Sequence, residues 1–264
     1  MISPRNFHPG QQESLTASEV HAPRQVDTPD FNRLAGLYRW MELVCFGPWL
    51  WWCRCAYLAD LNGCRQALVL GEGDGRFTAR LLRANSSIHI DAVDASSAML
   101  QTLARCAAPH AAAHLGSPRL RTHCADARNW KPGSLQGIFP TTQPYDLVVT
   151  HFFLDCLTTE EVQALATKLH RVVSPSALWL VSEFAVPSGW FGSLIARPIV
   201  YGLYWAFSQL TGLAVRRLPC YASALSASGF TLVKHRTWLG GLLRSELWTA
   251  LPPNTGVTPT PTPI

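Results

Sequence analysis

Short apolar runs alternate with helical patterns over most of the chain. Five runs of aliphatic and β-branched residues are each followed by a stretch with helical spacing, which is typical of a parallel sheet covered by helices on both faces. Two further runs are separated only by Leu239, Gly240 and Gly241, which predicts an antiparallel closing pair. The chain is therefore predicted to form a doubly wound α/β domain with a seven-stranded, mostly parallel sheet. The predicted strands are 67–71, 88–94, 120–126, 145–151, 177–184, 230–238 and 242–250.

The two ends of the chain lack this alternation. Residues 1–28 are polar and aperiodic, and residues 252–264 repeat Thr and Pro, so we expect both to be disordered. Between them we expect a single domain over 29–251, because 264 residues with 48% hydrophobic content suit one elaborated core. The expected parts of this domain are N-terminal helices at 29–62, the core of the sheet at 64–185 and a lid insert at 186–220.

A glycine-rich turn follows the first predicted strand, in ALVLGEGDGRFTARLL. Gly71, Gly73 and Gly75 stand between strand and helix, an arrangement that brings backbone amides and a helix N-terminus close to a ligand. The next strand ends at Asp94, where a carboxylate can accept hydrogen bonds from both ribose hydroxyls. Loop and acid together indicate a nucleotide-like cofactor. The alternative is that the glycines only make a tight turn and Asp94 only caps the next helix.

The glycine spacing separates two kinds of cofactor. Turns that bind dinucleotides read G-x-G-x-x-G, because the third glycine lets the helix pack close to the strand. Here the position three residues after Gly73 is Arg76. The spacing therefore disfavours a nicotinamide or flavin dinucleotide.

The glycine loop, Asp94 and a second acid resemble the motifs of class I S-adenosylmethionine-dependent methyltransferases. Asp126, in HCADARNW, matches the acid after the third strand, and YDLVVTHFFLDC matches the fourth strand, whose edge faces the methyl acceptor in that family. The resemblance covers residues 64–185 and implies a Rossmann-like fold whose cofactor is S-adenosyl-L-methionine. The cofactor-binding residues that it implies are Gly71, Glu72, Gly73, Asp74, Gly75, Asp94, Ala95, Asp126, Ala127 and Thr150.

The resemblance also implies a role for these groups. The glycine loop lies against the methionine part, Asp94 holds the ribose, and Asp126 receives the adenine amino group while Ala127 offers its backbone amide. Many members carry an acid two residues before the first glycine, where this chain has Val69. Contacts with the amino group of the cofactor would then come from elsewhere, with the two acids inside the loop as candidates.

Candidate catalytic residues follow the fourth predicted strand. Methyl transfer is an in-line displacement, so alignment is the main task and a base is needed only where the acceptor must lose a proton. His151 is a candidate general base, and Asp155 can orient it or a substrate hydroxyl. The alternative is that His151 is an ordinary hydrogen-bonded residue and Asp155 caps the helix that begins near Thr158. The edge reads THFF rather than Asn-Pro-Pro-aromatic, so the resemblance points away from methylation of adenine or cytosine amino groups.

Two aromatic segments flank the core. Trp49, Trp51 and Trp52 lie in the N-terminal helices, and the insert contains no charged residue from Ile199 to Val215. This stretch is at the lower limit for a membrane span, so we expect a lid or an interfacial helix that touches a membrane surface. One interpretation is a pocket for an apolar or aromatic acceptor, and the other is that the segments pack together as core. The aromatic residues of the insert are Trp190, Phe191, Tyr201, Tyr204, Trp205 and Phe207.

Composition and charge limit the kinds of ligand and partner that we expect for this chain. The formal charge is +5 without a block of like charges, so no nucleic-acid partner is expected. Arg76, Arg80 and Arg83 can share one helix face, which is more typical of a solvated stripe than of a binding surface. The eight cysteines form no C-x-x-C pair, so no metal site is expected. The N-terminus lacks the apolar stretch of a secretion signal, which favours a cytoplasmic location.

The sequence thus predicts a methyltransferase that uses S-adenosyl-L-methionine and acts on a small, apolar or aromatic acceptor, with peripheral membrane contact as a further expectation. Two alternatives stay open. A macromolecule (RNA or protein) methyltransferase should show a coherent basic surface. A cofactor-binding protein without turnover is suggested only by Val69.

Overall fold

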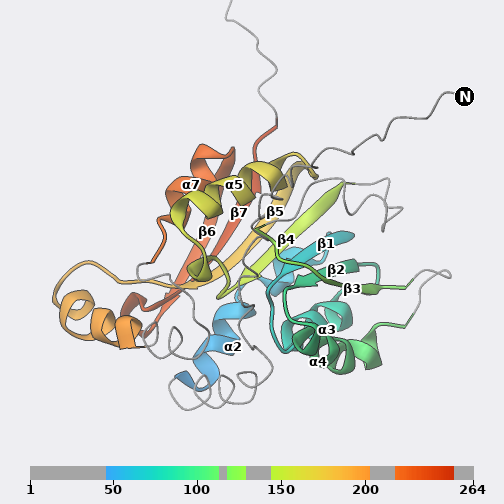
Figure 1. The fold of residues 1–264 in the computed structure, drawn as a ribbon, viewed down its shortest axis with the longest axis horizontal. Helices are drawn as coiled ribbons and strands as arrows, with labels where there is room; N and C mark the ends of the chain where they lie inside the picture. Colours follow the sequence, from blue (N-terminus) through green and yellow to red (C-terminus); the bar gives the residue numbers. More distant parts are fainter. Residues whose placement is uncertain (1–45, 113–117, 129–143, 203–217, 253–264) are drawn as a thin grey trace, which may run out of the picture.

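Seven strands of the described residues form one sheet. They are β1 (Gln66–Leu70), β2 (His89–Asp94), β3 (Leu120–Cys124), β4 (Tyr145–His151), β5 (Val173–Phe184), β6 (Phe230–Trp238) and β7 (Leu243–Ala250). The computed structural model describes residues 46–112, 118–128, 144–202 and 218–252 (Figure 1). The strand order is β3-β2-β1-β4-β5-β7-β6, with β7 antiparallel between β5 and β6 and the other pairings parallel. The predicted doubly wound sheet with one antiparallel closing strand is confirmed.

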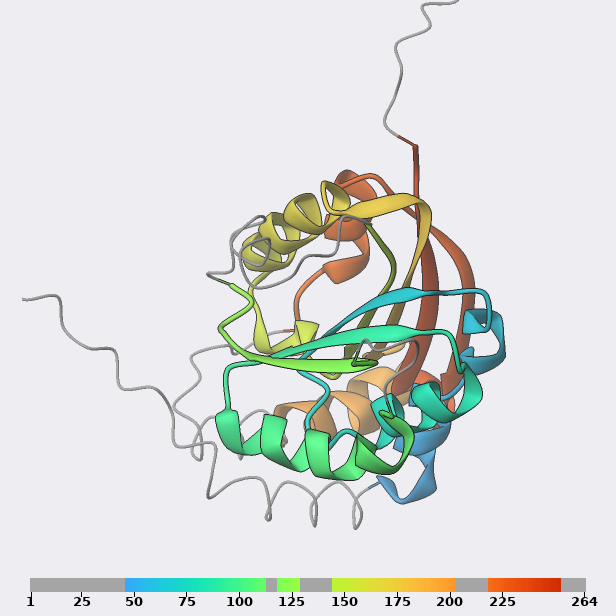
Figure 2. The same ribbon diagram turned by 90° about the vertical axis from the view of Figure 1, so that its right-hand side faces the viewer.

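Helices cover both faces of the sheet. One face carries α3 (Arg76–Ala84) and α4 (Ser97–Ala107), and the other carries α5 (Thr159–His170) and α7 (Tyr221–Ala227), as Figures 1 and 2 show. A further helix, α2 (Pro48–Arg54), contacts β6 and β7. The short segments are η1 (Leu58–Leu61), η2 (Ala108–His110), η3 (Leu154–Cys156), η5 (Leu239–Gly241) and the π-helical η4 (Gly192–Ala196), which lies within a helical stretch at 190–202.

Local sequence signals explain where the helices begin. Pro48 is the first residue of α2 and follows the N-cap Gly47. Proline suits the first helical position because it has no amide hydrogen that would be left unpaired there. A capping box starts α5: the Thr158 hydroxyl accepts from the Glu161 amide, and the Glu161 carboxylate accepts from the Thr158 amide. Thr158, and not Asp155, therefore caps this helix.

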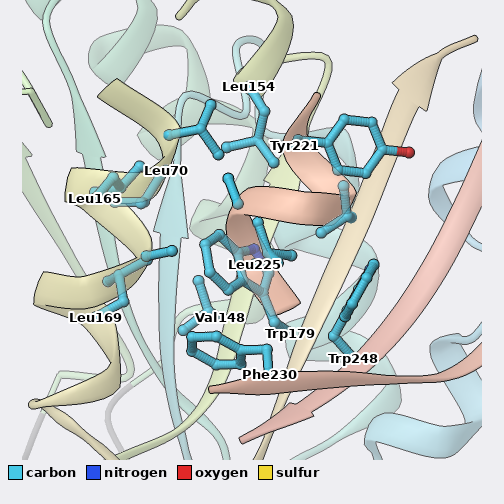
Figure 3. Packing of buried hydrophobic residues seen from close by; sticks show 14 of the residues in the cluster. Leu70, Val148, Leu154, Leu165, Leu169, Trp179, Tyr221, Leu225, Phe230 and Trp248 are labelled. Atoms are coloured by element: carbon cyan, nitrogen blue, oxygen red, sulfur yellow. The ribbon is translucent and has the colours of Figure 1, made fainter. Parts of the chain in front are cut away.

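The core has one apolar cluster on each face of the sheet. In the cluster beneath α5 and α7, Trp179 is completely buried among aliphatic and aromatic side chains (Figure 3). Its Nε1 donates to the Thr150 hydroxyl at 3.0 Å, and its ring meets that of Phe230 edge-on with centroids 5.0 Å apart. The cluster on the other face packs Phe77 and Leu81 of α3 against the strands. Burial on both faces explains why the inner strands β1, β2 and β4 read as nearly continuous apolar runs.

A third cluster joins α2 and the helical stretch at 190–202 to the edge of the sheet. The ring of Phe184 lies 5.3 Å from that of Phe46 and 5.0 Å from that of Phe152, centroid to centroid. Phe191 packs against this cluster, whereas Trp190 is 72% exposed. The two predicted aromatic segments thus meet in part as packed core. Outside the described residues lie the predicted arm 1–28, residues 253–264 of the predicted tail, and Tyr204, Trp205 and Phe207. None of the described helices is long and apolar enough to cross a bilayer.

Replacing Trp179 by Ala tests the cluster beneath α5 and α7. We expect the free energy of unfolding to fall by about 3 to 5 kcal/mol, because the substitution leaves a cavity and an unpaired Thr150 hydroxyl. Thr150→Val, which removes only the hydrogen bond, should cost about 1 to 3 kcal/mol. Urea denaturation followed by circular dichroism measures both values. A loss in Trp179→Ala no larger than that in Thr150→Val would contradict the expectation.

Candidate active site

A pocket with a cavity volume of about 190 Å³ opens where β1, β2 and β4 end. Its walls come from the glycine loop, the ends of β2 and β4, the loop after β3, and Arg54 of α2. Ligands of open α/β sheets bind at the carboxyl ends of the strands, so this pocket is the candidate active site. The predicted site residues that line it are Gly71, Glu72, Gly73, Asp94, Ala95, Asp126, Ala127 and His151. The predicted residues Asp74, Gly75, Thr150 and Asp155 do not line it.

The glycine loop adopts a left-handed backbone at each glycine. The φ angles are +62° at Gly71, +82° at Gly73 and +80° at Gly75, a region that residues with a side chain rarely adopt. A methyl group on Gly71 would come within 2.2 Å of the Phe153 ring, and one on Gly75 within 2.5 Å of the Leu103 backbone. A methyl group on Gly73 would meet no atom within 4 Å. Gly71 and Gly75 are thus required by packing, whereas Gly73 leaves open space beside the pocket.

Both acids of the glycine loop are engaged at the start of α3. One carboxylate oxygen of Glu72 accepts from the amides of Phe77 (2.7 Å) and Thr78 (3.1 Å), and the other accepts from the Thr78 hydroxyl. These bonds satisfy amides in the first helical turn, where a negative charge is favourable. Burial nevertheless raises the pKa of Glu72 to about 7. Asp74 forms an ion pair with Arg76 at 2.6 Å, which holds it out of the pocket lining.

Asp94 presents one oxygen that is unoccupied among the described residues. Its Oδ1 accepts from the Ser96 amide at 2.8 Å, and no hydrogen bond to Oδ2 joins it to the described part of the chain. The cap of α4 is Ser96, whose hydroxyl accepts from the Met99 amide. Burial raises the pKa of Asp94. Asp94 is therefore not the helix cap, and its second oxygen can accept from ligand hydroxyls.

Asp126 lines the pocket as a paired carboxylate. The Arg128 guanidinium donates to both of its oxygens, with the shortest contact at 2.7 Å, and the Arg128 amide donates to Oδ1 at 2.9 Å. Burial alone would raise the pKa of Asp126, but the hydrogen bonds and charge of Arg128 outweigh burial and lower it. A ligand amino group that approaches Asp126 shares the carboxylate with Arg128.

His151 is buried in the pocket wall without a hydrogen-bond partner. Its ring meets that of Phe77 edge-on with centroids 4.5 Å apart, and both ring nitrogens lack partners within the described ranges. Burial, together with the nearby charge of Arg54, lowers its pKa well below the ordinary value. His151 is therefore neutral near pH 7. A buried polar group without a partner is rare in proteins, and here a ligand in the pocket can supply one.

Thr150 faces away from the pocket, although it is adjacent to His151. Successive side chains of a strand point to opposite faces of the sheet, so only one of the two can face α3 and the pocket. Thr150 instead accepts the hydrogen bond from Trp179 on the α5 side. The structure therefore does not bring the Thr150 side chain into the pocket with the other predicted residues.

Asp155 is buried behind the edge of β4 and does not orient His151. The Cys156 thiol donates to Asp155 at 3.4 Å, and burial raises the pKa of Asp155 to about 6. The edge itself is held by Glu183 of β5, which accepts from the amides of Phe153 (3.1 Å) and Leu154 (2.8 Å). Burial, and then the charge of Asp155, raises the pKa of Glu183. No group of three or more His, Cys, Asp or Glu side chains in the described ranges is arranged to hold a metal ion.

Arg54 is a pocket residue that the sequence analysis did not single out. Its side chain is buried, its guanidinium lies 5.4 Å from the centre of the Phe152 ring, and its charge acts on both Glu72 and His151. A buried guanidinium suits the carboxylate or phosphate of a ligand, because it donates several hydrogen bonds in one plane. A signal was present in the sequence, since Arg54 is the single charged residue between Glu42 and Asp60.

Comparison with known proteins agrees with this geometry. Residues 67–176 match the family model of a methyltransferase domain, while no curated protein matches the chain in sequence. An O-methyltransferase family protein from Burkholderia thailandensis shares the fold at 13% identity and a TM-score of 0.59, over 84% of this chain and 61% of that chain. The mitomycin 7-O-methyltransferase MmcR does so at 15% identity and a TM-score of 0.57, over 83% and 60% of the two chains. The chain thus spans about three fifths of the length of these two proteins.

A third similar structure contains a ligand. It is the N-methyltransferase NodS from Bradyrhizobium japonicum in complex with S-adenosyl-L-homocysteine, at 11% identity and a TM-score of 0.50, over 86% of this chain and 91% of that chain. Residues 67–176 thus match a methyltransferase domain, and the fold is that of the class I S-adenosylmethionine-dependent methyltransferases, as predicted. The residues present fit S-adenosyl-L-methionine, because Gly73 leaves room beside the loop and Asp94 offers a carboxylate oxygen for hydroxyls.

Gly73→Ala tests whether the open space at the loop receives the cofactor. We expect affinity for S-adenosyl-L-homocysteine to fall by at least about tenfold, because the methyl group fills this space, while strain at positive φ lowers stability by only about 1 to 2 kcal/mol. Gly63→Ala is the control, since its methyl group would also meet no atom within 4 Å and its φ is not in the left-handed region. Calorimetric titration measures affinity. Equal affinity in the two variants would place the cofactor elsewhere.

Proposed function

We propose that the protein transfers the methyl group of S-adenosyl-L-methionine to a small, apolar or aromatic acceptor. The observation that carries this proposal is one pocket that combines an open glycine loop at Gly73 with the buried, unpartnered His151. When bound, the cofactor supplies a methyl group on a sulfonium. The acceptor atom would bond to this methyl carbon in line with the carbon–sulfur bond, and S-adenosyl-L-homocysteine would leave. The protein holds the reactants in alignment, which can contribute about 7 to 11 kcal/mol to lowering the barrier.

Four parts of the pocket hold the cofactor in this proposal. Asp94 accepts hydrogen bonds from the ribose hydroxyls through Oδ2, and the backbone of Gly71 and Gly73 lies along the methionine part. Ala127 offers its amide to the adenine. Arg54 pairs with the carboxylate of the cofactor, which is supported by its burial in the wall beside the loop.

The acceptor binds at the end of β4. The neutral imidazole of His151 takes the proton of an acceptor hydroxyl or amine, and the rings of Phe152 and Phe153 exclude water from the reacting atoms. The mostly apolar side chains at this end of the pocket favour an apolar or aromatic acceptor over a charged one. The fold shared with an O-methyltransferase and an N-methyltransferase supports an oxygen or nitrogen acceptor.

Exposed apolar side chains support a lipophilic acceptor and peripheral contact with a membrane on its cytoplasmic side. Trp190 and Leu194, on the helical stretch at 190–202, are 72% and 71% exposed, and Trp52 of α2 is 49% exposed. Large apolar side chains that face water suit an interface with lipid headgroups. Turnover of lipophilic phenols and acids, compared with and without lipid vesicles, tests this part of the proposal. Equal turnover in both conditions would contradict the proposed contact with a membrane.

Asp94→Ala tests the cofactor site by calorimetric titration with S-adenosyl-L-methionine and S-adenosyl-L-homocysteine. We expect micromolar binding to the unaltered protein and a loss of at least about tenfold in the variant, because a carboxylate that accepts from two hydroxyls is removed. Asp60→Ala is the control, because Asp60 pairs with Lys234 on the surface.

The same titration separates the competing functions. No binding of either ligand to the unaltered protein would overturn the proposal. Binding without transfer to any acceptor in the screen would favour a cofactor-binding protein without turnover. Salt-sensitive binding of RNA, with methylation of the RNA, would favour a macromolecule methyltransferase.

His151→Gln tests the general base once the screen yields an acceptor. We expect kcat to fall by about 10² to 10⁴ with unchanged affinity for S-adenosyl-L-homocysteine. Because the pKa of His151 is lowered, turnover of the unaltered protein should stay constant through neutral pH and decline only in acid, where the imidazole becomes protonated. His235→Gln, at an exposed position of β6, is the control. An unchanged kcat in His151→Gln would exclude it as the base.

A further inference from the structure

A second hollow runs along α3, apart from the candidate active site. It is a groove of about 800 Å³, and none of the described residues lines both it and the active-site pocket. Trp51 and Leu58, from α2 and η1, line one part of it, and His110 of η2 lines another. Along α3 it is lined by Arg76, Arg80 and Arg83. Figure 2 shows α3 and α4 side by side beneath the sheet, with η2 following α4.

Two of the three arginines of the groove have no acidic partner among the described residues. They are spaced four and three residues apart, so they share one face of α3, where like charges cost about 0.2 to 0.5 kcal/mol per pair. Arg76 pairs with Asp74, but Arg80 and Arg83 are exposed and have no ion-pair partner in the part of the chain that the structure describes. No acidic residue is among the described residues that line the groove. An anion in the groove would relieve this repulsion.

Hydrogen bonds tie both walls of the groove to the C-terminal end of α3. The Arg119 guanidinium donates to the carbonyls of His110 and Leu82, each at 2.9 Å. The Asn85 side-chain amide donates to the carbonyls of Leu61 (3.2 Å) and Cys64 (2.7 Å). Both Arg119 and Asn85 are buried. The groove is therefore preformed, and a ligand would not have to bear the cost of ordering its walls.

The groove combines guanidinium groups with an aromatic and aliphatic wall. Guanidinium groups bind phosphate oxygens through paired hydrogen bonds, and an indole stacks on aromatic rings. We propose that this groove is a second binding site, for an organic phosphate with an aromatic or apolar body. Three arginines on a single helix suit one or two phosphate groups better than a long polyanion. The interpretation of these arginines as a solvated stripe does not account for the preformed walls.

Calorimetric titration with 1-naphthyl phosphate tests the site, with inorganic pyrophosphate as a second probe. Saturating S-adenosyl-L-homocysteine keeps the probes out of the active-site pocket. We expect the double variant Arg80→Gln, Arg83→Gln to weaken binding of both probes by at least about tenfold, because charge-assisted hydrogen bonds are lost. The control Arg105→Gln, Arg171→Gln removes the same charge from exposed positions outside the groove and should change affinity by less than about twofold.

The proposal would be overturned if neither probe bound the unaltered protein, or if the groove variant lost no affinity. Equal loss of affinity in both double variants would also overturn it, because it would indicate general attraction to positive charge. If a single-stranded oligoribonucleotide binds through Arg80 and Arg83 at least about ten times more tightly than 1-naphthyl phosphate, the ligand is a nucleic acid instead. Affinity of the groove variant for S-adenosyl-L-homocysteine should be unchanged. Failure of this proposal is therefore distinguishable from failure of the proposed methyl transfer.

Discussion

The pocket depends on the contact between the loop after β1 and the edge after β4. Gly71 lies so close to the Phe153 ring that no side chain fits between them. Hydrogen bonds hold both partners: the Gly71 amide donates to the Val93 carbonyl at 2.9 Å, and Glu183 accepts from the Phe153 amide. The positions of the glycine loop and of the edge after β4 are therefore linked, so in the proposed reaction a shift in one strand end would change the distance between cofactor and acceptor. Such alignment is the main contribution a methyl-transferring protein can make.

The strands could be predicted closely because turn residues bound them and because the inner strands β1, β2, β4 and β7 are buried on both faces. The exception is β5, which begins at Val173 rather than 177. Its first part contains Pro175 and Ser176, and Ser176 has a φ of +64°, so the apolar pattern is interrupted although the chain still pairs with Tyr145. A break in the hydrophobic pattern ends a predicted strand even where the pairing in the sheet continues.

The candidate site was only partly predictable, and the reason differs from residue to residue. Motif spacing located Gly73 and Asp94, because both follow directly from where a strand ends. Thr150 does not line the pocket, and the sequence alone could not show this, since strand alternation assigns faces only once the register is known. Two features depend on side-chain contacts that a linear pattern does not encode: the ion pair of Asp126 with Arg128, and the position of Arg54 in the pocket wall. Arg54 in particular reaches the pocket from α2, a segment that the sequence analysis interpreted only through its tryptophans.

The position of β7 has a consequence for how the protein is made. Although it is the last of the described strands in sequence, β7 lies inside the sheet, with seven residue pairs to β5 on one side and with β6 on the other. During synthesis the backbone of β5 remains an open edge until residues 243–250 leave the ribosome, and an open apolar edge can pair with other chains. The half-made protein is thus more prone to aggregation than the finished one, and completing the C-terminal hairpin is the step that closes the sheet.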